Sequence, residues 1–274
     1  MKKFYYSLFA AATMLLATTS CSQEEDFAQQ SSNEVTTFSV SLDGAVGSRT
    51  VGDGTTATKL YYEVYRGNDC IIDANTVINT TAQIEMPLLK GETYDIVFWA
   101  QADGAIYKVD NLKNITIDYT NTNLMANQKS YDAFYNALGG FQADGKSHTI
   151  ELRRPLAQLN LGTDDWNKAM EGLTTAEKAE GPVTHTSVKV SGLADTFNPL
   201  TGKAEGDATA EFKLSTIPSQ DKFTSNGKEY KYLSFNYLLV PSQKAPQGEG
   251  EYVKESSDEK ANVDLTFALN RGEK

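Results

Sequence analysis

The sequence contains few of the residues from which metal sites, disulfide frameworks and nucleic-acid interfaces are built. Its 274 residues include two cysteines and two histidines, too few for a zinc framework or a disulfide scaffold. Acidic residues outnumber basic ones by 36 to 25, which disfavours a nucleic-acid partner. No dinucleotide fingerprint or nucleophile elbow is present. We therefore expect no catalytic residues, no cofactor and no metal, and an enzyme of glycan breakdown is the least favoured alternative.

The chain begins with the features of an export signal. Lys2 and Lys3 precede an apolar run over residues 4–17, which is 14 residues long. A membrane-spanning helix needs about 20 apolar residues, so this run predicts a signal peptide instead. Small residues then lead to Cys21. We predict a signal peptide over residues 1–20, with cleavage between Ser20 and Cys21.

The small residues that end in cysteine resemble the lipobox of bacterial lipoproteins, although Thr18 stands where the lipobox usually has leucine. The resemblance implies that Cys21 carries a diacylglycerol and further acyl chains, enough for stable attachment to a membrane. Residues 22–26 (SQEED) resemble the acidic signal that directs Bacteroidetes lipoproteins to the outer face of the outer membrane. Read by charge alone, residues 21–33 are a solvated, flexible tether, and the two interpretations are compatible.

Alternation of apolar and polar residues predicts an all-β chain. The segment 94–99 is apolar on both faces, which indicates a central strand. Helices are expected only over residues 130–138, residues 165–172 with Thr163 or Asp164 as the cap, and after the capping-box sequence Thr174–Glu177. The expected strands are 38–42, 60–65, 94–99, 115–119, 150–152, 157–161, 188–190, 212–214, 230–240 and 263–269.

Short strands between polar turns predict antiparallel β-sandwiches. Composition changes near residues 171–185, which predicts two domains, 34–175 and 176–274. Tyr94 follows Gly91 at the start of a strand, so its hydroxyl is expected to bond back to the preceding loop as a tyrosine corner.

The remaining candidate residues have mostly structural interpretations. We expect His148 and His185 in exposed loops, because neither has a partner at metal or catalytic spacing. Cys70 is expected to be buried beside Ile71 and Ile72. Trp166 follows two aspartates at an expected helix start, and an exposed tryptophan there is a candidate ligand contact.

Three sequence blocks stand out: residues 91–101 (GETYDIVFWAQ), 131–135 (YDAFY) and 152–163 (LRRPLAQLNLGT). Together they resemble the fimbrillin-like lipoproteins of Bacteroidetes, in particular a branch with FWA and RPLAQLNLGT blocks. The resemblance implies a type V pilin-like protein with two transthyretin-like β-sandwich domains. It also implies that an arginine-specific protease cuts after the first strand, and that a strand of another subunit fills the groove left behind.

Carried onto this sequence, the first strand is residues 35–42 and the cut falls between Arg49 and Thr50, in a loop of small residues. The alternative is that Arg49 is an ordinary loop arginine. The sequence ends just after an expected strand, which leaves two alternatives: a truncated C-terminal domain, or a subunit that accepts a strand but donates none.

These features predict a surface-exposed outer-membrane lipoprotein, held by the lipid on Cys21. Its expected role is that of an accessory, anchor or tip subunit whose partners are other fimbrillin-like subunits. The second hypothesis is a surface-exposed module that binds a host protein or a glycan.

Overall fold

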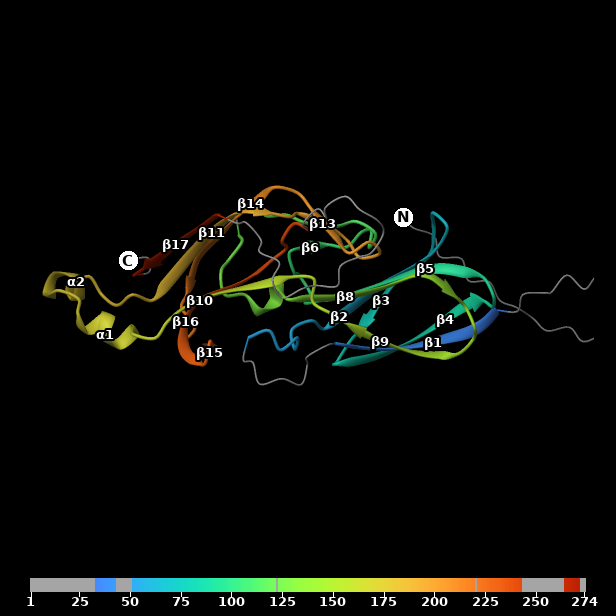
Figure 1. Ribbon diagram of the computed structural model, residues 1–274, viewed down its shortest axis with the longest axis horizontal. Helices are drawn as coiled ribbons and strands as arrows, with labels where there is room; N and C mark the ends of the chain where they lie inside the picture. Colours follow the sequence, from blue (N-terminus) through green and yellow to red (C-terminus); the bar gives the residue numbers. More distant parts are fainter. Residues whose placement is uncertain (1–32, 43–50, 122, 220, 243–263, 272–274) are drawn as a thin grey trace, which may run out of the picture. The chain divides into compact units, whose positions relative to one another are not determined.

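The regular secondary structure of the computed structural model is almost entirely β-strand, as the sequence predicts (Figure 1). It describes residues 33–42, 51–121, 123–219, 221–242 and 264–271. Within these ranges the helical elements are α1 (Trp166–Glu171), α2 (Thr175–Ala179) and one 3-10 turn (Lys129–Tyr131). None of the helices in the described ranges is long and apolar enough to cross a membrane.

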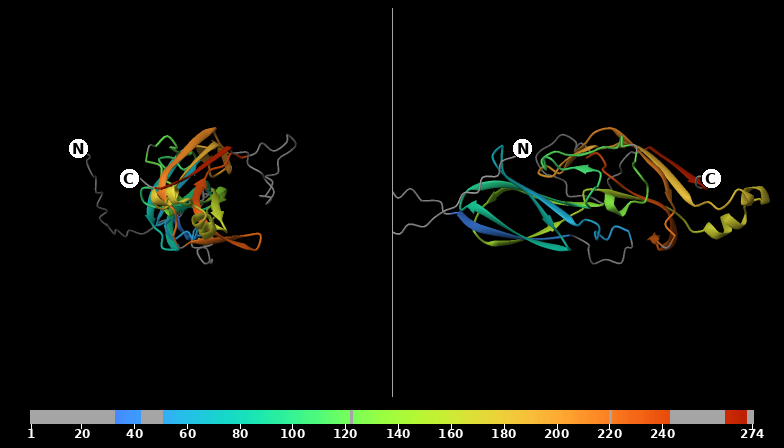
Figure 2. Two further views of the ribbon diagram at one scale, coloured as in Figure 1. Left: turned by 90° about the vertical axis from the view of Figure 1, so that its left-hand side faces the viewer. Right: turned by 180° about the vertical axis from the view of Figure 1, so that it is seen from behind.

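Two sheets share a hydrophobic core in the first half of the chain. One has the strand order β4 (Thr81–Leu89), β1 (Asn33–Leu42), β9 (Ser147–Leu152). The other has the order β3 (Asp69–Val77), β2 (Lys59–Arg66), β5 (Thr93–Gln101), β8 (Ala133–Gln142). Both views in which the strands run across the page show the two layers facing each other (Figures 1 and 2). The apolar strand β5 lies between β2 and β8, which confirms its predicted central position.

Three further sheets surround a second core. They have the orders β10 (Ala157–Thr163), β16 (Lys228–Leu238), β15 (Lys222–Ser225); β14 (Ala208–Thr216), β11 (His185–Leu193), β17 (Asp264–Asn270); and β13 (Lys203–Glu205), β12 (Thr196–Asn198), β7 (Ile115–Ile117), β6 (Tyr107–Lys108). The second core includes Trp99, the last residue of the apolar segment 94–99, which is 1% exposed.

Strand pairing in this second group joins segments from both sides of residue 175. Strand β7 pairs with β12, and β10 pairs with β16. The composition change near residues 171–185 coincides with α1, α2 and the segment that leads into β11. Strands from both sides of residue 175 are thus hydrogen-bonded to each other. The division into domains 34–175 and 176–274 stays a prediction.

The predicted helix over residues 130–138 is wrong. A single 3-10 turn ends at Tyr131, and residues 133–142 form strand β8 instead. Ala133, Phe134 and Tyr135 are consecutive and all buried, which a strand between two cores allows and an amphipathic helix does not. Pairing with β5 thus overrides the local helical pattern.

Two local predictions, a capping box and a tyrosine corner, are confirmed. The capping box is present at α2, where Thr174 Oγ1 accepts from the Glu177 backbone N–H and the Glu177 carboxylate accepts from that of Thr174. The predicted cap of α1, Thr163 or Asp164, is wrong: the helix is preceded by Asp165, whose side chain makes no capping hydrogen bond. The tyrosine corner is confirmed: the buried Tyr94 hydroxyl accepts a hydrogen bond from the Leu89 backbone N–H at 3.1 Å.

Candidate functional site

Strand β1 is the middle strand of its sheet. It pairs antiparallel with β4, from Asn33↔Leu89 to Ser41↔Thr81, and parallel with β9, from Thr37↔Ser147 to Leu42↔Leu152. Both hydrogen-bonding edges of β1 are therefore occupied over most of its length. If β1 left the sheet, β4 and β9 would face each other with two unpaired edges, the arrangement that accepts a strand from another chain.

The inward face of β1 is part of the first core. Phe38 and Val40 are fully buried, and Leu42 is 7% exposed. The Phe38 ring centroid lies 5.6 Å from that of Phe98 and 5.5 Å from that of Phe141. Burial of each such side chain contributes about 1.5–3 kcal/mol. The groove without β1 would therefore be strongly apolar.

The outward face of β1 is different in character. Thr37, Ser39 and Ser41 are half-buried, and Val35 is 51% exposed. Glu34 falls on the inward-facing period at the start of the strand, where its carboxylate forms an ion pair of 3.0 Å with Lys90. The period of two in the sequence correctly predicts which side chains face the core.

Residues 43–50 separate β1 from the next described segment. The predicted processing site, Arg49 and Thr50, lies in this range, outside the described residues. Ser20 and Cys21 also lie outside them, as do the signal peptide and most of the tether. The structure resumes at Val51, which is only 1% exposed and belongs to the second core.

The segment that begins at Val51 is fixed by a buried ion pair. Arg154 donates from Nε and Nη2 to the two carboxylate oxygens of Asp132, at 2.6 and 2.8 Å, and Nη2 also donates to the Gly52 carbonyl at 2.9 Å. Asp132 is 1% exposed, and this burial raises its pKa while the guanidinium opposes the shift. The chain just after residue 50 is thus held by contacts that do not involve β1.

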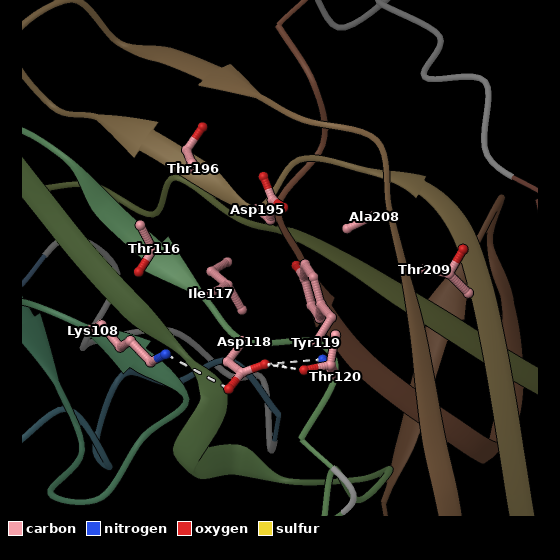
Figure 3. A pocket seen from close by; sticks show the side chains of 10 residues that line it. All are labelled: Lys108, Thr116, Ile117, Asp118, Tyr119, Thr120, Asp195, Thr196, Ala208 and Thr209. Atoms are coloured by element: carbon pink, nitrogen blue, oxygen red, sulfur yellow. Dashed lines mark hydrogen bonds and ion pairs between the residues drawn. The ribbon is translucent and has the colours of Figure 1, made fainter.

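A cavity lies among the sheets that surround the second core (Figure 3). This cavity has a volume of about 470 Å³ and contains the Lys108–Asp118 ion pair of 3.7 Å. Thr120 donates to the Asp118 carboxylate through its hydroxyl at 2.6 Å, which lowers the pKa of that carboxyl. The lining residues are Lys108, Thr116, Ile117, Asp118, Tyr119, Thr120, Asp195, Thr196, Ala208 and Thr209. Hydroxyl, carboxylate and ammonium groups of this kind can hydrogen-bond to a polyhydroxylated ligand.

The predicted ligand contact Trp166 does not line this cavity. It is the first residue of α1 and is half-buried. The Lys231 Nζ atom lies 5.7 Å from the centroid of its ring and donates a hydrogen bond to the Pro218 carbonyl. Trp166 as a ligand contact stays a prediction, separate from the cavity.

Two predicted environments for polar residues are wrong. Cys70 is exposed, because β3 is an edge strand that shields little of its own surface. His148 lies in β9 and packs against Phe38 and Phe141, with its Nε2 2.9 Å from Asp144.

His185 is also misplaced by the prediction, since it starts β11 instead of lying in a loop, and its Nδ1 is 2.7 Å from the Thr184 hydroxyl. Within the described ranges, no group of three or more His, Cys, Asp or Glu side chains is placed to hold a metal ion.

One segment of the chain matches the sequence motif of phosphate-binding loops. Residues 140–147 (GFQADGKS) match the spacing G-x-x-x-x-G-K-S of phosphate-binding loops. That function needs a strand followed by a helix whose first N–H groups surround the phosphate. Here the segment connects strands β8 and β9, and the Asp144 carboxylate accepts from the Lys146 backbone N–H. The match therefore has no phosphate-binding geometry.

The ion pair next to Gly52 allows a direct test. We expect Arg154→Met to lower the free energy of unfolding by about 2–4 kcal/mol, because it leaves the Asp132 carboxylate buried without its partner. The matched control is Arg153→Met at the neighbouring exposed position, which should cost less than about 1 kcal/mol. Urea denaturation of both variants measures the difference, and equal losses would contradict the assigned role of Arg154.

Comparison with known proteins gives one family match and several structural neighbours. No curated protein matches the chain. A candidate adhesin from Bacteroides ovatus is 10% identical, with a TM-score of 0.47 over 92% of this chain and 83% of its own. A candidate polysaccharide-binding protein (DUF1812) from Bacteroides thetaiotaomicron is 11% identical, with a TM-score of 0.46 over 85% of this chain and 75% of its own.

The fimbrial anchor protein Mfa2 from Porphyromonas gingivalis is 12% identical, with a TM-score of 0.39 over 77% of this chain and 75% of its own. All three TM-scores lie below 0.5, so we base the function on the strands and contacts described above. The family model matches residues 28–270, and the chain therefore belongs to the family described as a family of unknown function (DUF6562).

Proposed function

We propose that this protein is a cell-surface structural lipoprotein, a fimbrillin-like accessory, anchor or tip subunit that joins its partners by β-strand addition. The observation that carries the proposal is the position of β1, a middle strand with an apolar inward face. It is joined to the rest of the fold only through residues 43–50, and the far side of that connection is fixed by Arg154. One cut within residues 43–50 would therefore end the covalent connection between β1 and the rest of the fold.

Such a cut would not by itself release β1. Its two ladders and the burial of Phe38, Val40 and Leu42 would still hold it in place, at about 1.5–3 kcal/mol for each of these side chains. Release needs a competing strand that restores the same pairing with β4 and β9. A strand of a neighbouring subunit, held nearby at high local concentration, meets that need.

The consequence for anchoring follows from the order of the chain. Cys21 precedes β1, and Arg49 follows it. A subunit cut after Arg49 would leave its lipid with the departing strand and remain attached through its new neighbour. An uncut subunit would keep both the lipid and β1, as an anchor or accessory subunit requires.

The processing step can be tested with an arginine-specific protease on the purified protein without its signal peptide. We expect one cut, with Thr50 as the new N-terminal residue by mass spectrometry, retained β-structure by circular dichroism, and higher oligomers on gel filtration. Arg49→Lys is the matched control and should stay intact under the same protease. A first cut at the exposed Arg66, or loss of β-structure on cutting after Arg49, would contradict the proposal.

Attachment to the outer membrane is tested separately by metabolic labelling with radioactive palmitate. We expect the natural chain to be labelled and Cys21→Ala to lose all label, since the acyl chains are proposed to reside on that sulfur. Cys70→Ala is the control, because it removes the other, exposed thiol and should leave labelling unchanged. Label that persists on Cys21→Ala would disprove the proposed lipidation site.

The 470 Å³ cavity favours a second candidate function, a surface module that binds a carbohydrate. A glycan array should then show binding that Asp195→Asn reduces at least tenfold, because a carboxylate there would accept hydrogen bonds from sugar hydroxyls. Trp166→Ala is informative as a comparison, since Trp166 lies outside the cavity. Absence of binding across the array, or loss only with Trp166→Ala, would remove the cavity as the ligand site.

A further inference from the structure

Strand β1 fits its own groove imperfectly at the end nearer the N-terminus. Thr36 faces inward and is 0% exposed. Its hydroxyl Oγ1 has no hydrogen-bond partner among the described residues. A buried hydroxyl without a partner destabilises the folded state, because it loses its bonds to water and gains none in return.

The sequence of β1 makes this defect specific. Thr36 and Thr37 are adjacent and chemically identical, but their side chains point to opposite faces of the sheet. Thr37 is half-buried on the outer face, and Thr36 lies across from Met86 on the inner side of β4. Valine has nearly the same shape as threonine and carries no hydroxyl, so it would fill the inward position without the penalty.

A second imperfection lies at the other end of β1. The Leu42 side chain lines a partly open pocket of about 160 Å³, between the buried Ala57 and Ile78 and the exposed Asn79 and Thr80. Ala57 and Ile78 are each 1% exposed, so the pocket is formed partly by the apolar core. Unfilled apolar volume next to a core residue costs stability, because the lining atoms lack contacts on one side.

Between these two ends the fit is close. Phe38 and Val40 are both 0% exposed, and the Phe38 ring is surrounded by Phe98, Phe141 and His148 at 5.5–5.6 Å between centroids. The groove thus has a well-filled centre, an apolar position occupied by a hydroxyl, and a terminal position larger than leucine.

We propose that this groove is shaped for a strand of another protein chain that fits it better than β1 does. That strand has an apolar side chain at the place of Thr36, an aromatic one at the place of Phe38, and a side chain larger than leucine at the place of Leu42. This inference rests on the proposed function and adds the sequence preference of the partner. Strand exchange is then favourable because it removes both defects.

The fit of β1 itself is tested on the uncut chain, independently of any exchange. Thr36→Val should raise the equilibrium constant for folding about tenfold in urea denaturation, by removal of the orphan hydroxyl. Thr37→Val, at the half-buried outward position, is the matched control and should leave it within about twofold. Leu42→Phe should raise it severalfold by filling the pocket.

Unchanged or lowered stability with Thr36→Val overturns the first half of the inference, and lowered stability with Leu42→Phe overturns the second.

The partner preference is tested on the chain cut after Arg49, with peptides that correspond to residues 33–42 as competitors for the bound strand. The peptide with Thr36→Val should displace β1 at about one tenth the concentration needed by the natural sequence NEVTTFSVSL. The Leu42→Phe peptide should also be more effective, and the Thr37→Val peptide should equal the natural one. Release of a fluorescent label placed on β1 reports displacement.

The outcomes separate the two levels of the argument. Equal potency of the natural and Thr36→Val peptides overturns the inferred preference but leaves strand addition standing. Failure of every peptide to displace β1 contradicts the proposed function. In that case the urea measurements on the uncut chain still decide whether β1 underfills its groove.

Discussion

The placement of β1 between β4 and β9 is the constraint on which the first half of the structure depends. One ten-residue strand supplies two hydrogen-bonded ladders and, through Phe38, part of the core between the two sheets. The strand is the first described segment of the chain, while its parallel partner lies about a hundred residues further along. Its contacts are therefore nearly all long-range, and they can be supplied equally well by a segment that is not covalently joined.

Several elements near β1 are held in place by contacts that do not involve β1. Val51 and Gly52 are held by the second core and by Arg154, which is itself oriented by the buried Asp132. Strand β5 is secured independently between β2 and β8. Consequently the segment that begins at Val51 and the facing sheet have supports of their own, whereas β4 and β9 pair within their sheet only with β1.

The sequence predicts the features that depend on local alternation. The strand at 38–42 and its inward residues, the central position of β5 and the Tyr94 corner all follow from local patterns of apolar residues or from a turn residue. Strand β8 is missed, because its pairing with β5 outweighs a local pattern that suggests helix. His148 is misplaced for the same reason: its environment is created by β1, a partner distant in sequence.

The candidate site likewise has features that the sequence predicts and features that depend on long-range contacts. A sequence can place Arg49 after a strand, but it cannot reveal that Arg154 and Asp132 fix the chain beyond it, since those residues meet only in the fold. The 470 Å³ cavity draws its lining from β6, β7, the start of β12 and the start of β14. No spacing in the sequence predicts that combination. The orphan hydroxyl of Thr36 is likewise visible only once its neighbours are in place.

The mixed character of the sheet around β1 has a consequence for any assembly built on it. Because β1 runs antiparallel to β4 but parallel to β9, its two flanking strands offer hydrogen-bonding groups at different spacings. A strand that entered in the direction of β1 would reproduce both ladders, and a reversed strand would exchange the parallel and the antiparallel pattern between β4 and β9. Subunits joined through strands of the first kind would therefore all have the same polarity along an assembly.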